Sequence, residues 1–164
     1  MAEILAAILI ISDRVYSGEM QDLSSPGIEE YIKERGWNVS SIIVVNDDPE
    51  HIESALSALL QNDPANLILT AGGTGFGLRD NTPEATEKLI EKKVPGLPEL
   101  MRAKGSQHNP NAVLSRGVCG IAGGKLIINL PGKPKAAIEN LEAIRETLPH
   151  AIEMLPISAG HPKG

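Results

Sequence analysis

The feature that most constrains the fold is a continuous apolar run near the N-terminus, ILAAILIIS at residues 4–12. The run lacks the alternation of polar and apolar side chains that is expected of a strand with one face in water. A strand without a polar face is typical of a parallel sheet that helices cover on both sides. The sequence therefore predicts a sheet of this kind, with residues 4–12 as its first strand.

Strand-like and helix-like segments alternate along the rest of the chain. Further strands are expected in VSSIIVV (39–45), LILTA (67–71), VCGIAGG (118–124) and KLIINLPG (125–132). Helices are expected over residues 26–36, from Asp48 and Pro49, from Thr82 and Pro83, at Pro98 to Lys104, near Asn111 to Leu114, and from Pro134 through Leu148. This order predicts a three-layer α/β fold around a mostly parallel sheet. We expect one domain over residues 1–164, with a loose tail from about residue 157.

Composition excludes several classes of function. A chain of 164 residues is about one domain of material, and its net charge of −6 argues against partners such as nucleic acid or an anionic membrane surface. Cys119 is the only cysteine, so no internal disulfide can form, and we expect a cytoplasmic protein. The N-terminal apolar run is far shorter than the roughly 20 residues that a membrane span needs.

The third expected strand runs into a glycine-rich loop, LILTAGGTGFGLRDNTPEA, with glycines at 72, 73, 75 and 77. In open α/β sheets, ligands bind beyond the carboxyl ends of the strands, and backbone N–H groups of glycines can approach a phosphate closely. Neither the dinucleotide motif G-x-G-x-x-G nor the phosphate-loop motif G-x-x-x-x-G-K-[ST] fits the letters. Two interpretations of this segment therefore remain: a turn that only reverses the chain, or a phosphate-binding loop.

Two other strand ends carry similar chemistry. The first strand ends in Ser12, Asp13 and Arg14, followed by Ser17, and the last strand ends in LPGKPK with Lys133 before a helix start. Helix N-termini favour anions because their N–H groups are free. Since the carboxyl ends of parallel strands lie at one edge of the sheet, these turns and the glycine loop together predict a polyanion site.

Two carboxylates are not explained by helix capping. Asp48 and Thr82 are expected to cap helices, which leaves Asp47 and Asp80 without a structural reason. Carboxylates beside a phosphate site indicate a Mg²⁺ ion that lies between the two anions, so Asp47 and Asp80 are candidate metal ligands and catalytic residues. The four histidines have no paired spacing and no G-x-S-x-G elbow is present, which disfavours a zinc site and a serine triad. Arg116, in LSRG, is either an anion contact or an ordinary helix-end residue.

These letters resemble the MogA/MoaB-type molybdenum-cofactor biosynthesis proteins, which include the G domain of gephyrin and the matching domain of plant cofactor proteins. The likeness runs from ISDRVYSGEMQD through LTAGGTGFGLRDNTPEA and LSRG to INLPGKPKAA, almost the whole chain. The resemblance implies that AMP passes from MgATP to the terminal phosphate of molybdopterin and that pyrophosphate is released. ATP and molybdopterin would be the substrates and Mg²⁺ the metal.

The resemblance also implies roles for individual residues. Asp47 and Asp80 would hold Mg²⁺ and serve catalysis, while the substrate- and nucleotide-binding residues would be Ser12, Asp13, Ser17, Gly72, Gly73, Thr74, Gly75, Thr82, Pro83, Glu84, Ser115, Arg116, Pro131, Gly132, Lys133 and Pro134.

Several points stay open within the family. The turn NLPGKPK is similar to the adenylyltransferase (MogA) branch, whereas MoaB-type chains tend to carry MPGS there. The alternatives are a non-catalytic protein that carries molybdopterin and a trimeric scaffold like the gephyrin G domain. The resemblance further implies a homotrimer and a separate downstream protein that inserts molybdate.

Overall fold

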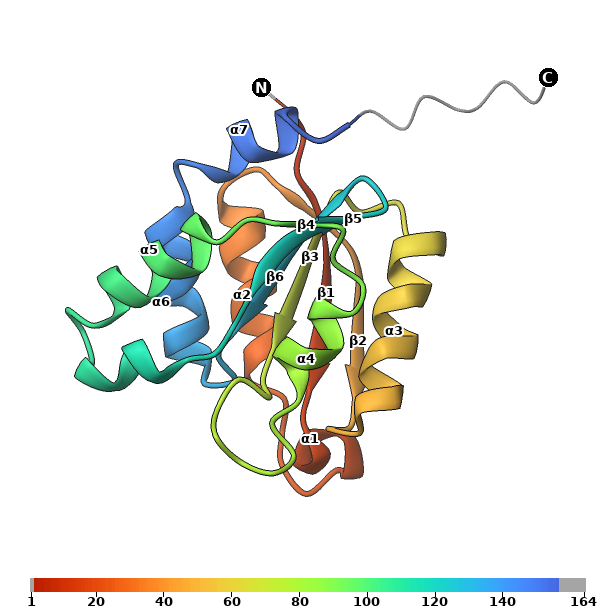
Figure 1. The fold of residues 1–164 in the computed structure, drawn as a ribbon, viewed down its shortest axis with the longest axis vertical. Helices are drawn as coiled ribbons and strands as arrows, with labels where there is room; N and C mark the ends of the chain where they lie inside the picture. Colours follow the sequence, from red (N-terminus) through yellow and green to blue (C-terminus); the bar gives the residue numbers. More distant parts are fainter. Residues whose placement is uncertain (1, 157–164) are drawn as a thin grey trace.

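The structure, a computed structural model, describes residues 2–156, in which six strands form one sheet (Figure 1). The strands are β1 (Leu5–Ile11), β2 (Asn38–Val45), β3 (Leu67–Ala71), β4 (Lys92–Lys93), β5 (Cys119–Ala122) and β6 (Lys125–Leu130). Their order across the sheet is β2-β1-β3-β6-β5-β4. The first four strands of this order are mutually parallel, whereas β5 is antiparallel to both of its neighbours. The predicted mostly parallel sheet is confirmed.

Helices lie on both faces of this sheet (Figure 1). They are α1 (Asp13–Ser17), α2 (Ser24–Glu34), α3 (Pro49–Asn62), α4 (Thr82–Glu87), α5 (Gly96–Gly105), the 3₁₀ helix η1 (Pro110–Leu114), α6 (Pro134–Ile144) and α7 (Leu148–Glu153). One face is covered by α2, α5, α6 and α7, and the other by α3 and α4. None of the helices within residues 2–156 combines the length and apolar character needed to cross a bilayer.

Alternate side chains of β1 enter two different apolar cores. Ile8 belongs to the core that includes Ile28 of α2 and Leu141 of α6, whereas Leu9 belongs to the core that includes Ile52 of α3. All of these side chains are fully buried. Burial on both faces explains why the first strand has no polar face, and the predicted three-layer arrangement is confirmed.

Several helix boundaries differ from the predicted ones. The helix predicted over residues 26–36 spans Ser24–Glu34, and the helix predicted at Pro98 to Lys104 spans Gly96–Gly105. The helix predicted from Pro134 through Leu148 ends at Ile144, and Leu148 begins α7 with Pro149 in its first turn. A proline fits the first turn of a helix but not its interior, so Pro149 forces a new start. Thr82 was predicted to cap α4, but the cap position is Asn81 and Thr82 is the first helical residue.

The loop expected after β1 contains a helix of five residues, α1. The Ser12 hydroxyl accepts a hydrogen bond from the Val15 N–H at 3.2 Å, and Gly18 ends the helix with φ of 84°. Five residues are too few for a periodic apolar pattern, so the cap was the only signal. The prediction of one domain with a loose tail stays a prediction, since the tail lies outside the described residues.

Candidate active site

A cavity of about 560 Å³ opens where the carboxyl ends of β1, β2, β3 and β6 meet. Its walls include Ser12, Arg14, Asp22, Asp47, the loop from Gly72 to Gly75, Asp80, and Gly132 to Pro134. The turns after β1, β3 and β6 therefore do converge, as the sequence predicts, and the turn after β2 joins them. Both candidate metal ligands, Asp47 and Asp80, line this cavity.

The glycine loop is shaped by two separate requirements. Gly72 and Gly73 adopt φ of 110° and 67°, values that favour glycine. A Cβ atom at Gly75 or Gly77 would lie 2.9 or 2.8 Å from Oδ2 of Asp80, and the Gly77 N–H donates to that same oxygen at 2.8 Å. The loop therefore wraps around a carboxylate, a reason for glycine that differs from phosphate binding.

The N–H groups of the loop are only partly available to a ligand. The Gly72 N–H donates to the Leu130 carbonyl at 3.1 Å and so extends the sheet. Within residues 2–156, the hydrogen bonds of the protein do not use the N–H groups of Gly73, Thr74 or Gly75. Three of the four predicted cradle positions therefore keep a free donor at the cavity wall.

Arg116 braces the loop from outside the cavity. Its Nε donates to the Gly75 carbonyl at 2.8 Å, its Nη2 donates to the Asp80 carbonyl at 2.7 Å, and its backbone N–H donates to the Thr74 carbonyl at 3.0 Å. Its Nη1 pairs with Glu84. Arg116 and Glu84 were both predicted to contact the ligand, but the structure places neither of them in the cavity wall.

Several other predicted residues also do not line this cavity. Thr82 and Pro83 are buried in the first turn of α4, and the Ser17 hydroxyl donates to the Arg14 carbonyl at 3.2 Å. Asp13 interacts with other protein groups, as described below. The structure does not place these four side chains in the wall that a ligand would meet.

Ser115 and Pro131 line a second cavity of about 430 Å³ beside the first. The two cavities share Thr74, Gly75, Gly132 and Lys133 in their walls. The glycine loop and the turn after β6 thus separate two adjacent chambers. A site with two chambers suits a reaction that brings two substrates together.

Asn129 is a buried polar residue that sequence analysis missed. Its amide donates to the hydroxyls of Thr70 at 2.9 Å and Thr86 at 3.0 Å, and its Oδ1 accepts from the Val118 N–H at 3.2 Å. These bonds join β6 to β3, α4 and the segment before β5, directly behind the glycine loop. A single asparagine inside the apolar strand KLIINL was the signal that could have revealed it.

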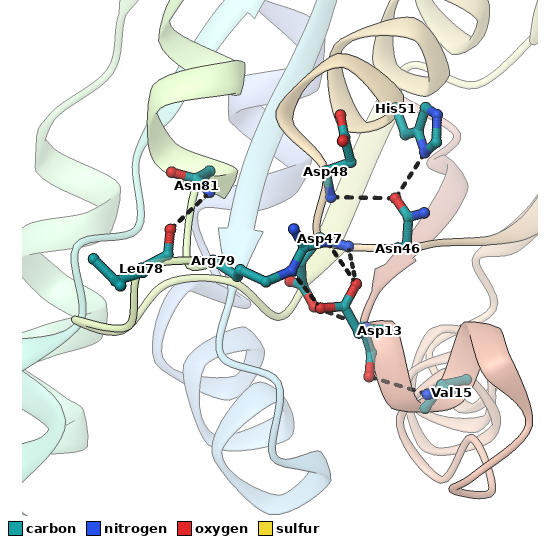
Figure 2. Close-up of polar contacts among 10 residues, drawn as sticks. Asp13, Val15, Asn46, Asp47, Asp48, His51, Leu78, Arg79 and Asn81 are labelled. Atoms are coloured by element: carbon teal, nitrogen blue, oxygen red, sulfur yellow. Dashed lines mark hydrogen bonds and ion pairs between the residues drawn. The ribbon is translucent and has the colours of Figure 1, made fainter.

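A cluster of charged groups lies where β1 and β2 end (Figure 2). The Asp13 N–H donates to Oδ2 of Asp47 at 2.8 Å, and the Asp47 N–H donates to Oδ1 of Asp13 at 3.0 Å. Hydrogen bonds from Arg79 lower the pKa of Asp13 to about 2. Burial raises the pKa of Asp47, and the nearby charges of Asp13 and Asp80 act in the same direction. The surroundings of the two neighbouring carboxyl groups thus shift their pKa values in opposite directions.

The lowered pKa of Asp13 predicts an effect on acid stability. Because the folded pKa of about 2 lies below the ordinary value of 3.8, Asp13 stabilises the fold above pH 3.8 and loses this effect as the pH falls to about 2. Arg79→Met should therefore unfold at a lower urea concentration than wild type at about pH 6. The difference should be small, since the ion pair is exposed, and it should vanish near pH 2. Equal differences in the urea midpoint at both pH values would contradict this origin.

Asp47 and Asp80 suit a Mg²⁺ ion that arrives with a phosphate-bearing substrate. Mg²⁺ is commonly held by one or two carboxylates together with phosphate and water oxygens. In the part of the chain that the structure describes, no group of three or more His, Cys, Asp or Glu side chains could hold a metal ion by itself. A Mg²⁺ ion at Asp47 and Asp80 would therefore need oxygens of a substrate or of water to complete its coordination.

The fold is that of an α/β protein with a cavity, the candidate ligand site, at the carboxyl ends of a mostly parallel sheet. The model of one family, described as "Probable molybdopterin binding domain", matches residues 7–150. The chain belongs to this family, which confirms the resemblance seen in its motifs.

Matches to named relatives cover most of the chain. A protein of Helicobacter pylori named molybdopterin adenylyltransferase is 41% identical over 157 residues, which are 94% of this chain and 89% of the relative. An Escherichia coli protein of the same name is 37% identical over 147 residues, 85% of this chain and 72% of the relative. A crystal structure titled as the molybdopterin biosynthesis enzyme MoaB of Thermus thermophilus has a TM-score of 0.86 and 45% identity, and the match covers 92% of this chain and 94% of that one.

Proposed function

We propose that this protein is a molybdopterin adenylyltransferase, a nucleotidyltransferase of molybdenum cofactor biosynthesis. The observation that carries the proposal is that Asp47 and Asp80 line one cavity with the glycine loop and Lys133. Two carboxylates beside the anion contacts suit a Mg²⁺ ion that bridges protein and phosphate, which adenylyl transfer requires and simple binding does not. The Helicobacter pylori and Escherichia coli relatives, both named molybdopterin adenylyltransferase, support the same activity.

In the proposed reaction, an oxygen of the terminal phosphate of molybdopterin attacks the α-phosphorus of ATP. The bond from that phosphorus to the bridging oxygen of pyrophosphate breaks, which gives adenylyl-molybdopterin and free pyrophosphate. No covalent intermediate with the protein is required. The protein therefore acts by positioning the two substrates and by neutralising charge.

The proposed roles follow from the groups that face the cavity. The N–H groups of residues 73–75 would hold phosphate oxygens, because no hydrogen bond of the protein within residues 2–156 uses them. The charged ends of Arg14 and Lys133 line the same cavity and would do likewise, because neither side chain forms an ion pair within the described residues. Asp47 and Asp80 would hold Mg²⁺, which neutralises phosphate charge when bound. The second chamber, which Ser115 and Pro131 line, would take part of the other substrate.

The other expectations stay predictions, two of them from the resemblance and the location from cysteine usage. They are a homotrimer, a separate protein that inserts molybdate, and a cytoplasmic location.

The decisive experiment is to mix the purified protein with molybdopterin and MgATP and to follow pyrophosphate release. We expect release that depends on both substrates and stops when EDTA removes the metal. Binding of molybdopterin without pyrophosphate release would instead favour a carrier.

A further inference from the structure

Arg79, on the glycine loop, reaches across the edge of the site to Asp13 at the start of α1. Its Nε lies 2.6 Å from Oδ2 of Asp13, and its Nη2 lies 2.9 Å from Oδ1. Figure 2 shows the Arg79 side chain extended toward Asp13, beside Asp47. Two parallel hydrogen bonds fix the relative orientation of a guanidinium and a carboxylate, which a single bond does not.

Asp13 is in turn joined to Asp47 by the two reciprocal bonds between backbone N–H groups and carboxylates. Arg79 also precedes Asp80 in the sequence. A continuous set of bonds therefore runs from the residue next to one candidate metal ligand to the carboxylate of the other. It connects the loop after β3 with the ends of β1 and β2.

Fold stability does not explain this ion pair well. The side chains of Arg79 and Asp13 are 56% and 41% exposed, and exposed ion pairs contribute little to stability. The loop itself is already fixed on its other side, where Arg116 donates to the carbonyls of Gly75 and Asp80. What Arg116 does not fix is the distance from the loop to the ends of β1 and β2.

We propose that Arg79 is a positioning residue, which sets the spacing between the carboxylates of Asp47 and Asp80 by clamping the glycine loop to Asp13. Two carboxylates that face one cavity repel each other. The glycines around them offer little backbone resistance to a shift of the loop. The bond from Arg79 to Asp13 opposes this shift and keeps both carboxylates at the distance that a shared ligand requires.

The test compares Arg79→Met, Asp13→Asn and the double variant with wild type. The first measurement is hydrogen exchange of the amides of residues 74–81 in the absence of substrate and metal. Both single variants should exchange faster at these amides, and the double variant should be no faster, because each change breaks the same clamp. Lys88→Met is the matched control, since it removes an exposed ion pair of equal length, 2.6 Å, between Lys88 and Glu53 outside the cavity walls.

The second measurement, which rests on the proposed function, is the adenylylation rate over a Mg²⁺ titration. The turnover rate or the apparent affinity for Mg²⁺ should fall by about 10- to 100-fold in Arg79→Met and Asp13→Asn, as is common for residues that orient metal ligands. The KM for molybdopterin should stay unchanged, and Arg79→Lys should recover part of the loss. Lys88→Met should behave as wild type in both measurements.

Two results would overturn the clamp. If Asp13→Asn has wild-type exchange and rate while Arg79→Met loses activity, Arg79 acts on a substrate directly. If neither single variant changes exchange at residues 74–81, the ion pair does not hold the loop. Absence of pyrophosphate release in wild type would overturn the proposed function but leave the exchange experiment as a full test of the clamp.

Discussion

Replacement of Gly72 by alanine should lower the free energy of unfolding by about 3 kcal/mol and the melting temperature by on the order of 10 °C. Gly72 has φ of 110°, which strains any residue with a side chain, and an added Cβ would collide with the carbonyl oxygen of Ile11. The neighbouring atoms are backbone, so no side chain can rotate away. The end of β1 and the start of the glycine loop would have to separate. Differential scanning calorimetry measures both quantities.

Gly27→Ala is the matched control for this change. Gly27 lies within α2, and a Cβ there would meet no atom within 4 Å. Alanine favours a helix more than glycine does, so the free energy of unfolding of this variant should rise by about 0.5 to 1 kcal/mol. Replacement of glycine by alanine should thus change the free energy of unfolding in opposite directions at the two positions. A melting temperature of Gly72→Ala equal to that of wild type would show that the end of β1 can move without cost.

The sequence predicted the fold well because the strongest signals are local. The uninterrupted apolar letters of β1 require burial on both faces, and Pro49 and Pro134 mark helix starts that the structure has. Such signals depend on a few neighbouring residues and on general rules of burial. They indicate the layers and the helix starts without knowledge of any long-range contact.

The site was predicted less completely because its side chains choose partners far along the chain. Arg116 binds the Gly75 carbonyl and pairs with Glu84, residues that are 41 and 32 positions away. Nothing in the letters LSRG distinguishes a guanidinium that braces a loop from one that meets a ligand. Arg79 and Asp13 are 66 positions apart, and their contact also follows only from the way the strands assemble.

The position of the glycine loop was predicted correctly, but the predicted reason for its glycines was incomplete. Its place after β3 was predicted, and three of its N–H groups face no acceptor within the described residues. Gly75 and Gly77, however, leave room for the carboxylate of Asp80. The sequence contained both the glycines and the aspartate, but only the backbone path shows that they occupy the same space.

Asp80→Asn should lower the adenylylation rate by on the order of 10² to 10³, the loss expected when one preorganised stabilising group is removed. Asparagine keeps the size of the side chain and an oxygen that can accept from the Gly77 N–H, which Asp80 holds at 2.8 Å. The loop should therefore keep its shape. The lost charge is the one that would fix Mg²⁺ against the phosphates, so turnover should suffer while molybdopterin still binds to the free N–H groups of the loop. Pyrophosphate release and molybdopterin binding, measured on the same protein, separate the two effects.

Asp48→Asn provides the matched control, because it removes one carboxylate at the same edge of the sheet. Asp48 caps α3 by accepting from the Glu50 N–H at 2.9 Å, a role that asparagine fills equally well, and it does not line the cavity. Its rate should stay near that of wild type, which would show that net charge alone is not decisive. If Asp80→Asn instead adenylylates molybdopterin at nearly the wild-type rate across a Mg²⁺ titration, the role assigned to Asp80 is wrong. Asp47 would then have to be the principal metal ligand, since both oxygens of Asp13 are already bonded to Arg79.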